Sequence, residues 1–262
     1  MAIIDSFVNK YIDAELIRAN KERELAHQSS GKLSASMLYQ PVRFQLLKTI
    51  GAPRREFDAY TLAKFKRGND VEDWYVEQLK NSGVLITDQK LLSKYNLEWG
   101  ENTKQFKGTY KECIGYIDSI IDTDKMQSHK GIIPNEIKSV TNAKIRLIKK
   151  KGVDWHYKIQ ACLYALAMGL EWFAVTIISA EDLRSETSLF RTRDMQRDID
   201  HLIGNYVIAL NQWNKNKVLP TFAPNEHVKW TSNPKYSMFE EFWSTAPDSQ
   251  VITKLETLNA NT

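Results

Sequence analysis

The sequence Ile114-Gly115-Tyr116-Ile117-Asp118-Ser119-Ile120-Ile121-Asp122, followed by Glu136-Ile137-Lys138, decides the fold. Both stretches have the apolar character of strands, and turn residues separate them. Residues i and i+2 of a strand project from the same face, so Glu136 and Lys138 point together. Asp118 is expected to meet them from the neighbouring strand. The spacing therefore predicts two adjacent strands that bring two carboxylates and an ammonium to one place.

This combination of charges indicates a particular chemistry. Oxygen ligands suit a hard divalent cation such as Mg²⁺ or Mn²⁺. A lysine beside such a cation suits phosphate, because its point charge stabilises a phosphoryl oxyanion or orients a water molecule. The spacing thus indicates a metal-dependent phosphodiesterase, that is, a nuclease.

The competing interpretations are structural. A strand-end acid can cap a turn, which fits Asp122 better than Asp118, and Glu136 with Lys138 can form a surface ion pair. Apolar flanking residues argue against a solvated strand, and an acid inside an apolar strand is costly unless it is paired or binds a metal ion.

The amino-acid composition limits which classes of protein and which cysteine-based metal sites are possible. The 262 residues carry a net charge of +4, with 42% hydrophobic and 26% charged residues, as is ordinary for a soluble globular protein. The two cysteines, Cys113 and Cys162, are too few for a four-cysteine iron–sulfur cluster and do not form the pairs of a zinc ribbon. No apolar run of about 18 residues is present, so no membrane span is predicted. We expect an intracellular, soluble protein.

Periodicity and turn residues predict the order of elements. Helices are expected at residues 3–27, 34–39, 41–51, 60–81, 155–169 and 192–216, and strands at 84–86, 91–99, 106–122, 132–140 and 172–179. This order fits a mixed sheet flanked by helices. The aromatic residues after Pro220 predict a tail that folds back onto the body.

A basic stretch lies between the second strand of the site and the helix at 155–169. We expect it to form a loop that contacts DNA phosphates, which would make the affinity depend on salt. Its cations are Lys144, Arg146, Lys149, Lys150, Lys151 and Lys158. Trp155 next to it could stack on a base or anchor the start of the helix, and the anchor is the favoured reading.

Four segments together resemble the PD-(D/E)XK nuclease superfamily, specifically its RecB-like exonuclease branch. The N-terminal segment 33–44, the helix 68–79, the two strand motifs and Gln160-Ala161-Cys162-Leu163-Tyr164 carry the likeness, over about residues 33–180. The resemblance implies a restriction-endonuclease-like α/β core, with a central mixed sheet flanked by helices and with helical additions at both ends. It implies one nuclease domain over 1–262, divided into an extension (1–58), a catalytic core (59–180) and a C-terminal helix with its tail (181–262).

The resemblance also implies roles. Asp118 and Glu136 would bind the metal ion together with the backbone carbonyl of Ile137, and Lys138 would act on the attacking water and on the charge at phosphorus. Gln160 and Tyr164 are four residues apart and share a helical face. They would contact substrate phosphate or support Lys138; a plain packing role for Tyr164 is the alternative.

The chain departs from the family pattern at two positions. Many members of the branch carry a histidine ligand where this chain has Glu72, whose carboxylate is still an oxygen ligand for Mg²⁺ or Mn²⁺. Glu72 could instead belong to the acidic surface of its helix. Gln40 stands where iron–sulfur members place a cysteine, so apolar packing must hold the N-terminal segment.

The expected function is a metal-dependent DNA exonuclease of recombination, repair or replication, in the cytoplasm of a bacterial or phage-infected cell. A structure- or sequence-specific endonuclease with the same chemistry is the first alternative. A non-catalytic nucleic-acid-binding protein on a nuclease scaffold is the second. The strand polarity, the preference for single or double strands and the oligomeric state are left open.

Overall fold

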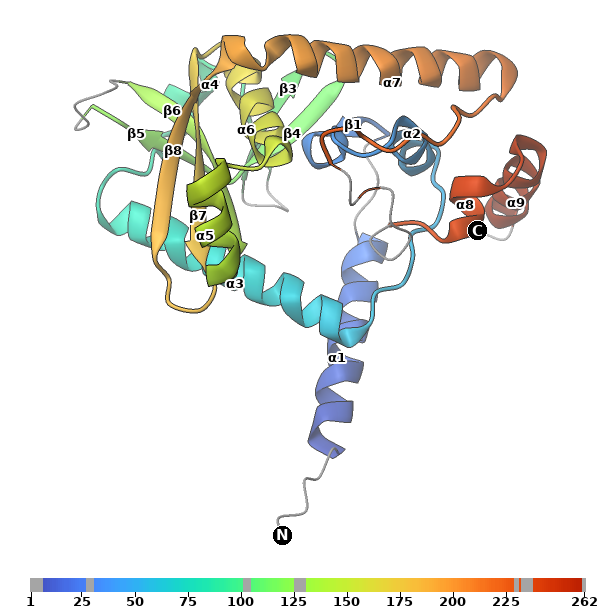
Figure 1. The fold of residues 1–262 in the computed structure, drawn as a ribbon, viewed down its shortest axis with the longest axis horizontal. Coiled ribbons are helices and arrows are strands. Elements are labelled where there is room, and N and C mark those ends of the chain that lie inside the picture. Colours follow the sequence, from blue (N-terminus) through green and yellow to red (C-terminus); the bar gives the residue numbers. More distant parts are fainter. Residues whose placement is uncertain are drawn as a thin grey trace.

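The computed structural model describes residues 7–26, 31–100, 105–124, 131–228, 231 and 238–260. Within them, helices flank two four-stranded mixed sheets (Figure 1). The predicted α/β class, with mixed β-sheet flanked by helices, is confirmed. The single central sheet that was expected is divided in two, and the division falls at Asp118.

The first sheet has the order β1-β4-β3-β2. Its strands are β1 (Leu33–Ser34), β2 (Glu98–Gly100), β3 (Gln105–Tyr110) and β4 (Cys113–Ile117). β1 runs parallel to β4, and the other neighbours are antiparallel. Lys111 turns the chain between β3 and β4 with a φ of 51°.

The second sheet has the order β5-β6-β7-β8. Its strands are β5 (Ser119–Asp122), β6 (Ile132–Val140), β7 (Trp172–Ser179) and β8 (Ser185–Arg191). β6 and β7 are parallel, which requires a crossover connection. That connection contains α5 (Asn142–Lys151) and α6 (Trp155–Met168).

Helices cover the sheets from opposite sides. α6 packs against β3, β4, β6 and β7, and seven of its residues are buried. α3 (Ala59–Asn81) packs against the other face of β6, where Val71 contacts Ile137 and Ile178. α7 (Gln196–Asn216) lies along the far side of α6, and α1 (Phe7–Ala26) contacts α3 and extends away from the body (Figure 1). The sheet residues of the site are therefore enclosed between α3 and α6.

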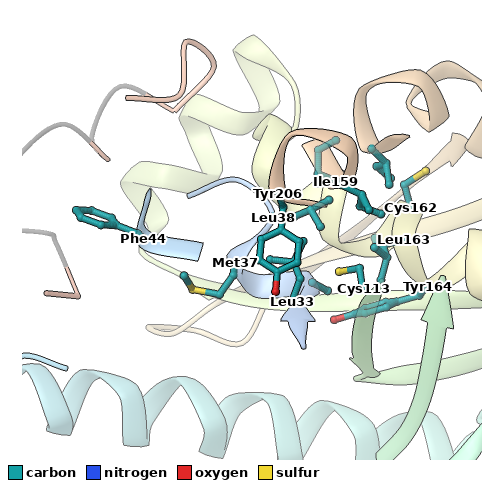
Figure 2. Close-up of a cluster of buried hydrophobic side chains, with 14 of the residues drawn as sticks. Leu33, Met37, Leu38, Phe44, Cys113, Ile159, Cys162, Leu163, Tyr164 and Tyr206 are labelled. Carbon is teal, nitrogen blue, oxygen red and sulfur yellow. The ribbon is translucent and has the colours of Figure 1, made fainter. Parts of the chain in front are cut away.

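The main core lies where the N-terminal segment meets α6 and α7. Figure 2 shows side chains from β1, α2 (Val42–Thr49), β4, α6 and α7 gathered in one cluster. Both cysteines lie in it with free thiols. The packing expected to replace an iron–sulfur cluster is present, and Gln45 adds hydrogen bonds from its side-chain amide to the carbonyls of Leu38 and Gln40, at 3.1 and 2.8 Å.

The tail folds back, as predicted, through α8 (Glu241–Thr245) and α9 (Asp248–Ala260). Phe239 and Trp243 are buried and Phe242 packs beside them, whereas Trp230 and Tyr236 lie outside the described residues. No helix in the described part of the chain is long and apolar enough to cross a membrane.

Several predicted elements are confirmed with small shifts of their ends. α3, α6, β6 and β7 match the expected ranges closely, and α2 spans most of 41–51. The described part of the expected helix at 3–27 is α1. The segment 34–39 contains only the short 3₁₀ helix Ala35–Met37, and α7 begins at Gln196 after a second 3₁₀ turn (Thr192–Asp194).

Other element predictions were wrong. The basic stretch is helix α5 rather than a loop, because the Thr141 hydroxyl caps it by accepting from the backbone N–H of Lys144 at 3.3 Å. The expected strand 91–99 begins instead as α4 (Gln89–Ser93), because the Asp88 carboxylate accepts two backbone N–H groups there. The expected strand 106–122 is divided into β3, β4 and β5. Residues 84–86 form only one bridge, between Leu85 and Ile121, and β8 was not predicted.

Candidate metal centre

Asp118 occupies the one-residue break between β4 and β5. The pairing of Ser119 with Asn135 places it beside Glu136 on β6, as the sequence predicts. Its Oδ2 accepts a hydrogen bond from the backbone N–H of Ile137 at 2.8 Å, and Gln105 approaches Oδ1 at 3.5 Å. The break in the strand thus turns this carboxylate towards the middle of β6.

Glu136 and Lys138 project together from β6 and form an ion pair. The Glu136 side chain is 0% exposed, whereas 27% of the Lys138 side chain is exposed. Neither Glu136 oxygen makes a hydrogen bond within the described part of the chain, so the ammonium of Lys138 is its principal partner. A buried carboxylate with so few partners is costly unless a cation stabilises it.

The electrostatics follow from this crowding. Burial, and then the charge of Asp118, raise the pKa of Glu136 to about 8, while Lys138 opposes that shift. Burial also raises the pKa of Asp118. Burial alone would lower the pKa of Lys138, but Glu136 and Asp118 outweigh it and raise that pKa above its usual value. Lys138 is therefore firmly cationic at neutral pH.

Glu72 reaches the same place from α3. Burial, and then the Asp118 charge, raise its pKa to about 8, and Lys138 acts in the opposite direction. Glu72 is half-buried, in contrast to the exposed Asp70, Asp73 and Glu77 on the same helix. The structure thus separates Glu72 from the acidic surface of α3 and groups it with the strand carboxylates.

These donors suit a divalent cation. Within the described residues no three His, Cys, Asp or Glu side chains are already spaced as a complete ligand set. After burial, the charge of Asp118 is nevertheless the next cause that raises the pKa of both Glu72 and Glu136, so both carboxyl groups lie near it. An oxygen-only set of this kind matches the preference of Mg²⁺ or Mn²⁺.

Gln160 and Tyr164 lie on the face of α6 that covers this cluster. The Gln160 amide donates to the Tyr164 hydroxyl at 3.0 Å. Tyr164 is 1% exposed, and burial, followed by the charge of Glu136, raises its pKa well above the usual value. Its ring lies against Gly115, where an added Cβ would be only 2.4 Å from the Tyr164 Cε1 atom. The buried Tyr164 side chain of α6 thus covers Glu136.

The predicted DNA-binding cations divide into paired and free groups. Lys144 pairs with Asp154 at 2.6 Å, Lys149 pairs with Glu186, and Lys158 lies 5.5 Å from the centre of the Phe190 ring. Three cations on α5 are exposed and have no ion-pair partner within the described residues: Arg146, Lys150 and Lys151.

Trp155 acts as an anchor in this structure. Its ring stacks on His227 with a centroid distance of 4.5 Å, and its Nε1–H donates to Asp198 at 3.3 Å. These contacts fix the start of α6 against α7, which is the favoured of the two roles expected from the sequence.

Two neighbours of the site were not found from the sequence. Tyr39 approaches His156 with a ring-centroid distance of 5.1 Å, and Lys138 and Glu136 both affect its pKa. Gln105 contacts Asp118 from β3. Tyr39 lies inside the N-terminal segment that carries the family resemblance, but no spacing in the sequence connects either residue to β6.

Comparison with solved structures finds similar backbones. An alkaline exonuclease, LHK-Exo, from Laribacter hongkongensis is 12% identical, with a TM-score of 0.45 over 69% of this chain and 88% of that chain. The structure of the same protein in complex with dAMP has a TM-score of 0.44 at 11% identity, over 69% of this chain and 88% of that chain. SSO0001 gives 0.44 at 14% identity, over 77% of this chain and 86% of that chain. No protein-family model and no curated protein sequence matches. At such identities the likeness concerns the path of the backbone alone.

Proposed function

We propose that this chain is a metal-dependent nuclease that hydrolyses phosphodiester bonds in DNA. The observation that supports it best is the convergence of Glu72, Asp118 and Glu136 on one cationic lysine from three separate elements. A purely structural ion pair would need one acid, and surface pairs contribute little to stability. Burial and the charge of Asp118 make the ionised forms of Glu72 and Glu136 costly, and a bound cation would offset that cost.

The carboxylates have distinct positions in the proposed centre. Glu72, Asp118, Glu136 and the carbonyl of Ile137 would hold Mg²⁺ or Mn²⁺. When bound, such an ion supplies Lewis-acid stabilisation of charge at the phosphoryl group. The hydrogen bond from the Ile137 N–H fixes the Asp118 carboxylate in orientation before any substrate arrives.

Lys138 acts as a cation in this proposal. Its raised pKa keeps it protonated at neutral pH, so it cannot serve as a general base. Its partly exposed ammonium is instead placed to donate hydrogen bonds to a phosphoryl oxygen or to orient the attacking water. Glu136 holds the ammonium in that position.

Gln160 and Tyr164 are assigned a positioning role. Tyr164 is too deeply buried to reach a substrate, and its hydroxyl accepts from Gln160 while its ring covers Glu136. The free cations of α5, Arg146, Lys150 and Lys151, are proposed to contact DNA phosphates.

We also propose that the enzyme is an exonuclease of the RecB-like branch, without an iron–sulfur cluster, that acts in recombination, repair or replication. Linear and circular single-stranded DNA of equal length, incubated with Mg²⁺ or Mn²⁺, tests it directly. Degradation of the linear form alone is expected. Cleavage of the circle would indicate an endonuclease, and binding without hydrolysis of either form would indicate a non-catalytic scaffold.

Lys138→Ala is expected to lower turnover at least about 100-fold while DNA affinity changes little, because one preorganised charge donor is lost. The test is single-turnover cleavage at saturating Mg²⁺, with circular dichroism to verify folding. Lys66→Ala is the matched control, because Lys66 is exposed and, among the described residues, pairs with Asp70 on the same helix. Equal turnover of the wild type and Lys138→Ala would refute the assigned role.

A further inference from the structure

Lys48, on α2, is a cation without a counter-ion. Its Nζ donates to the Ser34 hydroxyl at 2.8 Å, and no ion pair with an acid is found among the described residues. Burial, and then the nearby charge of Arg54, lower the pKa of Lys48 to about 8. Arg54 itself is exposed and has no partner within the described part of the chain. Two neighbouring cations without an acid form a site that favours an anion.

The surroundings supply further hydrogen-bond donors. The hydroxyl oxygens of Ser34 and Ser36 lie 3.3 Å apart, and Ser36 is exposed. Two hydroxyls, an ammonium and a guanidinium are groups that bind phosphate oxygens. The chemistry of the site therefore matches a phosphate group.

This cluster is connected to the candidate metal centre through β4. Ser34 on β1 pairs with Ile114, and Tyr116 and Asp118 follow on the same face of the chain at two-residue spacing. Gly115, between them, faces α6 on the opposite side. At about 3.3 Å per residue, the Ser34 position lies roughly 13 Å along the strand from Asp118. That distance corresponds to a few nucleotides of a bound strand.

α3 leaves room beside this face. Gly68 lies one turn before Glu72 on the same side of the helix, and a Cβ added there would meet no atom within 4 Å. Tyr116 is half-exposed. The surface of α3 one turn before Glu72 is therefore open, with no atom packed against Gly68.

We propose that Lys48, Arg54, Ser34 and Ser36 bind a phosphate of the substrate strand, a few nucleotides from the scissile bond. This inference rests on the proposed nuclease function. It assigns an anchoring point separate from the cations of α5. The bound group is either an internal phosphodiester or a terminal phosphate.

The test measures binding of a fluorescent single-stranded oligonucleotide by anisotropy, at several salt concentrations and with EDTA to prevent cleavage. Lys48→Met is expected to weaken binding roughly tenfold, because a charged hydrogen bond is lost. It should also reduce the magnitude of the salt slope by about 0.7, the value for one phosphate contact on a single strand. Lys48→Arg and the exposed control Lys10→Met should retain the wild-type slope.

Oligonucleotides with a 5′-phosphate, a 3′-phosphate or neither distinguish the two sources of phosphate. A loss confined to one phosphorylated end assigns the site to that terminus, and an equal loss on all three assigns it to an internal phosphodiester. Arg54→Met, at an exposed position, provides the same test if Lys48→Met does not fold. Unchanged slopes in both variants overturn the phosphate site. Failure of the wild-type chain to bind DNA would instead overturn the proposed function.

Discussion

Gly115 allows α6 to lie directly against β4. A side chain at this position would collide with the Tyr164 ring, which is fully packed and cannot move aside freely. Gly115→Ala is expected to destabilise the fold by about 1–3 kcal/mol through overpacking and to lower turnover by displacing Tyr164 from Glu136. Urea denaturation and single-turnover cleavage measure the two effects.

Gly204→Ala is the control for this substitution. Gly204 lies within α7, and an added Cβ there meets nothing within 4 Å. Alanine should stabilise that helix by about 0.5–1 kcal/mol. If both variants had the same unfolding free energy, Gly115 would not be in close contact with Tyr164.

The lowered pKa of Lys48 should make the stability of the folded chain depend on pH. Its pKa is about 8 in the folded chain and 10.5 in its ordinary state, so the unfolded chain binds more protons between these values. Its contribution to stability therefore rises with pH from about 8 to 10.5. Arg54 and Cys113 are the charged or titratable groups that face it.

The comparison that isolates Lys48 is wild type against Lys48→Met, unfolded with urea at pH values from 7.5 to 10.5. The wild type should gain stability relative to the variant as pH rises through this range. Tyrosines and cysteines with raised pKa values lower the stability as pH rises. They are present in both proteins, so their contributions cancel in the difference between the two unfolding free energies. A constant difference across the range would contradict the lowered pKa.

At the scale of elements, Arg43 joins α2 to the C-terminal helices. It is 5% exposed, and its guanidinium donates to the carbonyls of Trp243, Ala246 and Pro220 at 2.9, 2.9 and 3.2 Å. Asp248, at the start of α9, lies 3.6 Å away. Hydrogen bonds to a buried charge are strong, so this one side chain fixes α8 and α9 against the body.

Arg43→Met is expected to destabilise the protein by about 3–5 kcal/mol, because one buried and two partly buried carbonyls lose their donor. Hydrogen exchange should increase first in α8 and α9. Chemical denaturation gives the size of the effect, with Arg184→Met as the control, since that side chain is exposed and its partners Asp182 and Asn142 lie at the surface. A loss below about 1 kcal/mol would show that the tail is held by apolar packing alone.

At the scale of the whole molecule, α3 and the two sheets are brought together around three carboxylates. Burial makes the ionised forms of these groups unfavourable, so an ion that binds only the folded chain should stabilise it. Mg²⁺ or Mn²⁺ at 100 times its dissociation constant would contribute about 2.7 kcal/mol. The midpoint temperature of thermal unfolding should therefore rise with added metal and return to its starting value with EDTA.

Asp118→Asn should reduce this metal-dependent shift, whereas Asp70→Asn, on the exposed side of α3, should leave it unchanged. The measurement does not depend on catalysis, so it tests the metal centre separately from the nuclease reaction. An upward shift of equal size in Asp118→Asn would place the bound ion elsewhere.

Elements that carry a signal within their own residues were predicted correctly, and elements that depend on distant partners were not. α3 is capped by Asp58, whose carboxylate accepts from the N–H of Thr61 at 2.7 Å, and α6 carries its own apolar pattern; both helices were predicted. β8 was missed because half of it is exposed and polar, and it exists only through pairing with β7. The basic helix α5 was taken for a loop because the clustered cations obscured its cap at Thr141.

The sequence by itself determined the charged residues of the site and their faces, because strand alternation fixes how Glu136 and Lys138 project and the apolar flanks place Asp118 beside them. Only the tertiary structure decided that Glu72 joins them from α3, that Tyr164 covers them from α6 and that Lys48 meets no acid among the described residues. These relations depend on how helices pack across a sheet. This packing depends on close contacts between segments that are distant in the sequence, such as Gly115 with Tyr164. Such contacts produce no periodic pattern of residues from which they could be predicted.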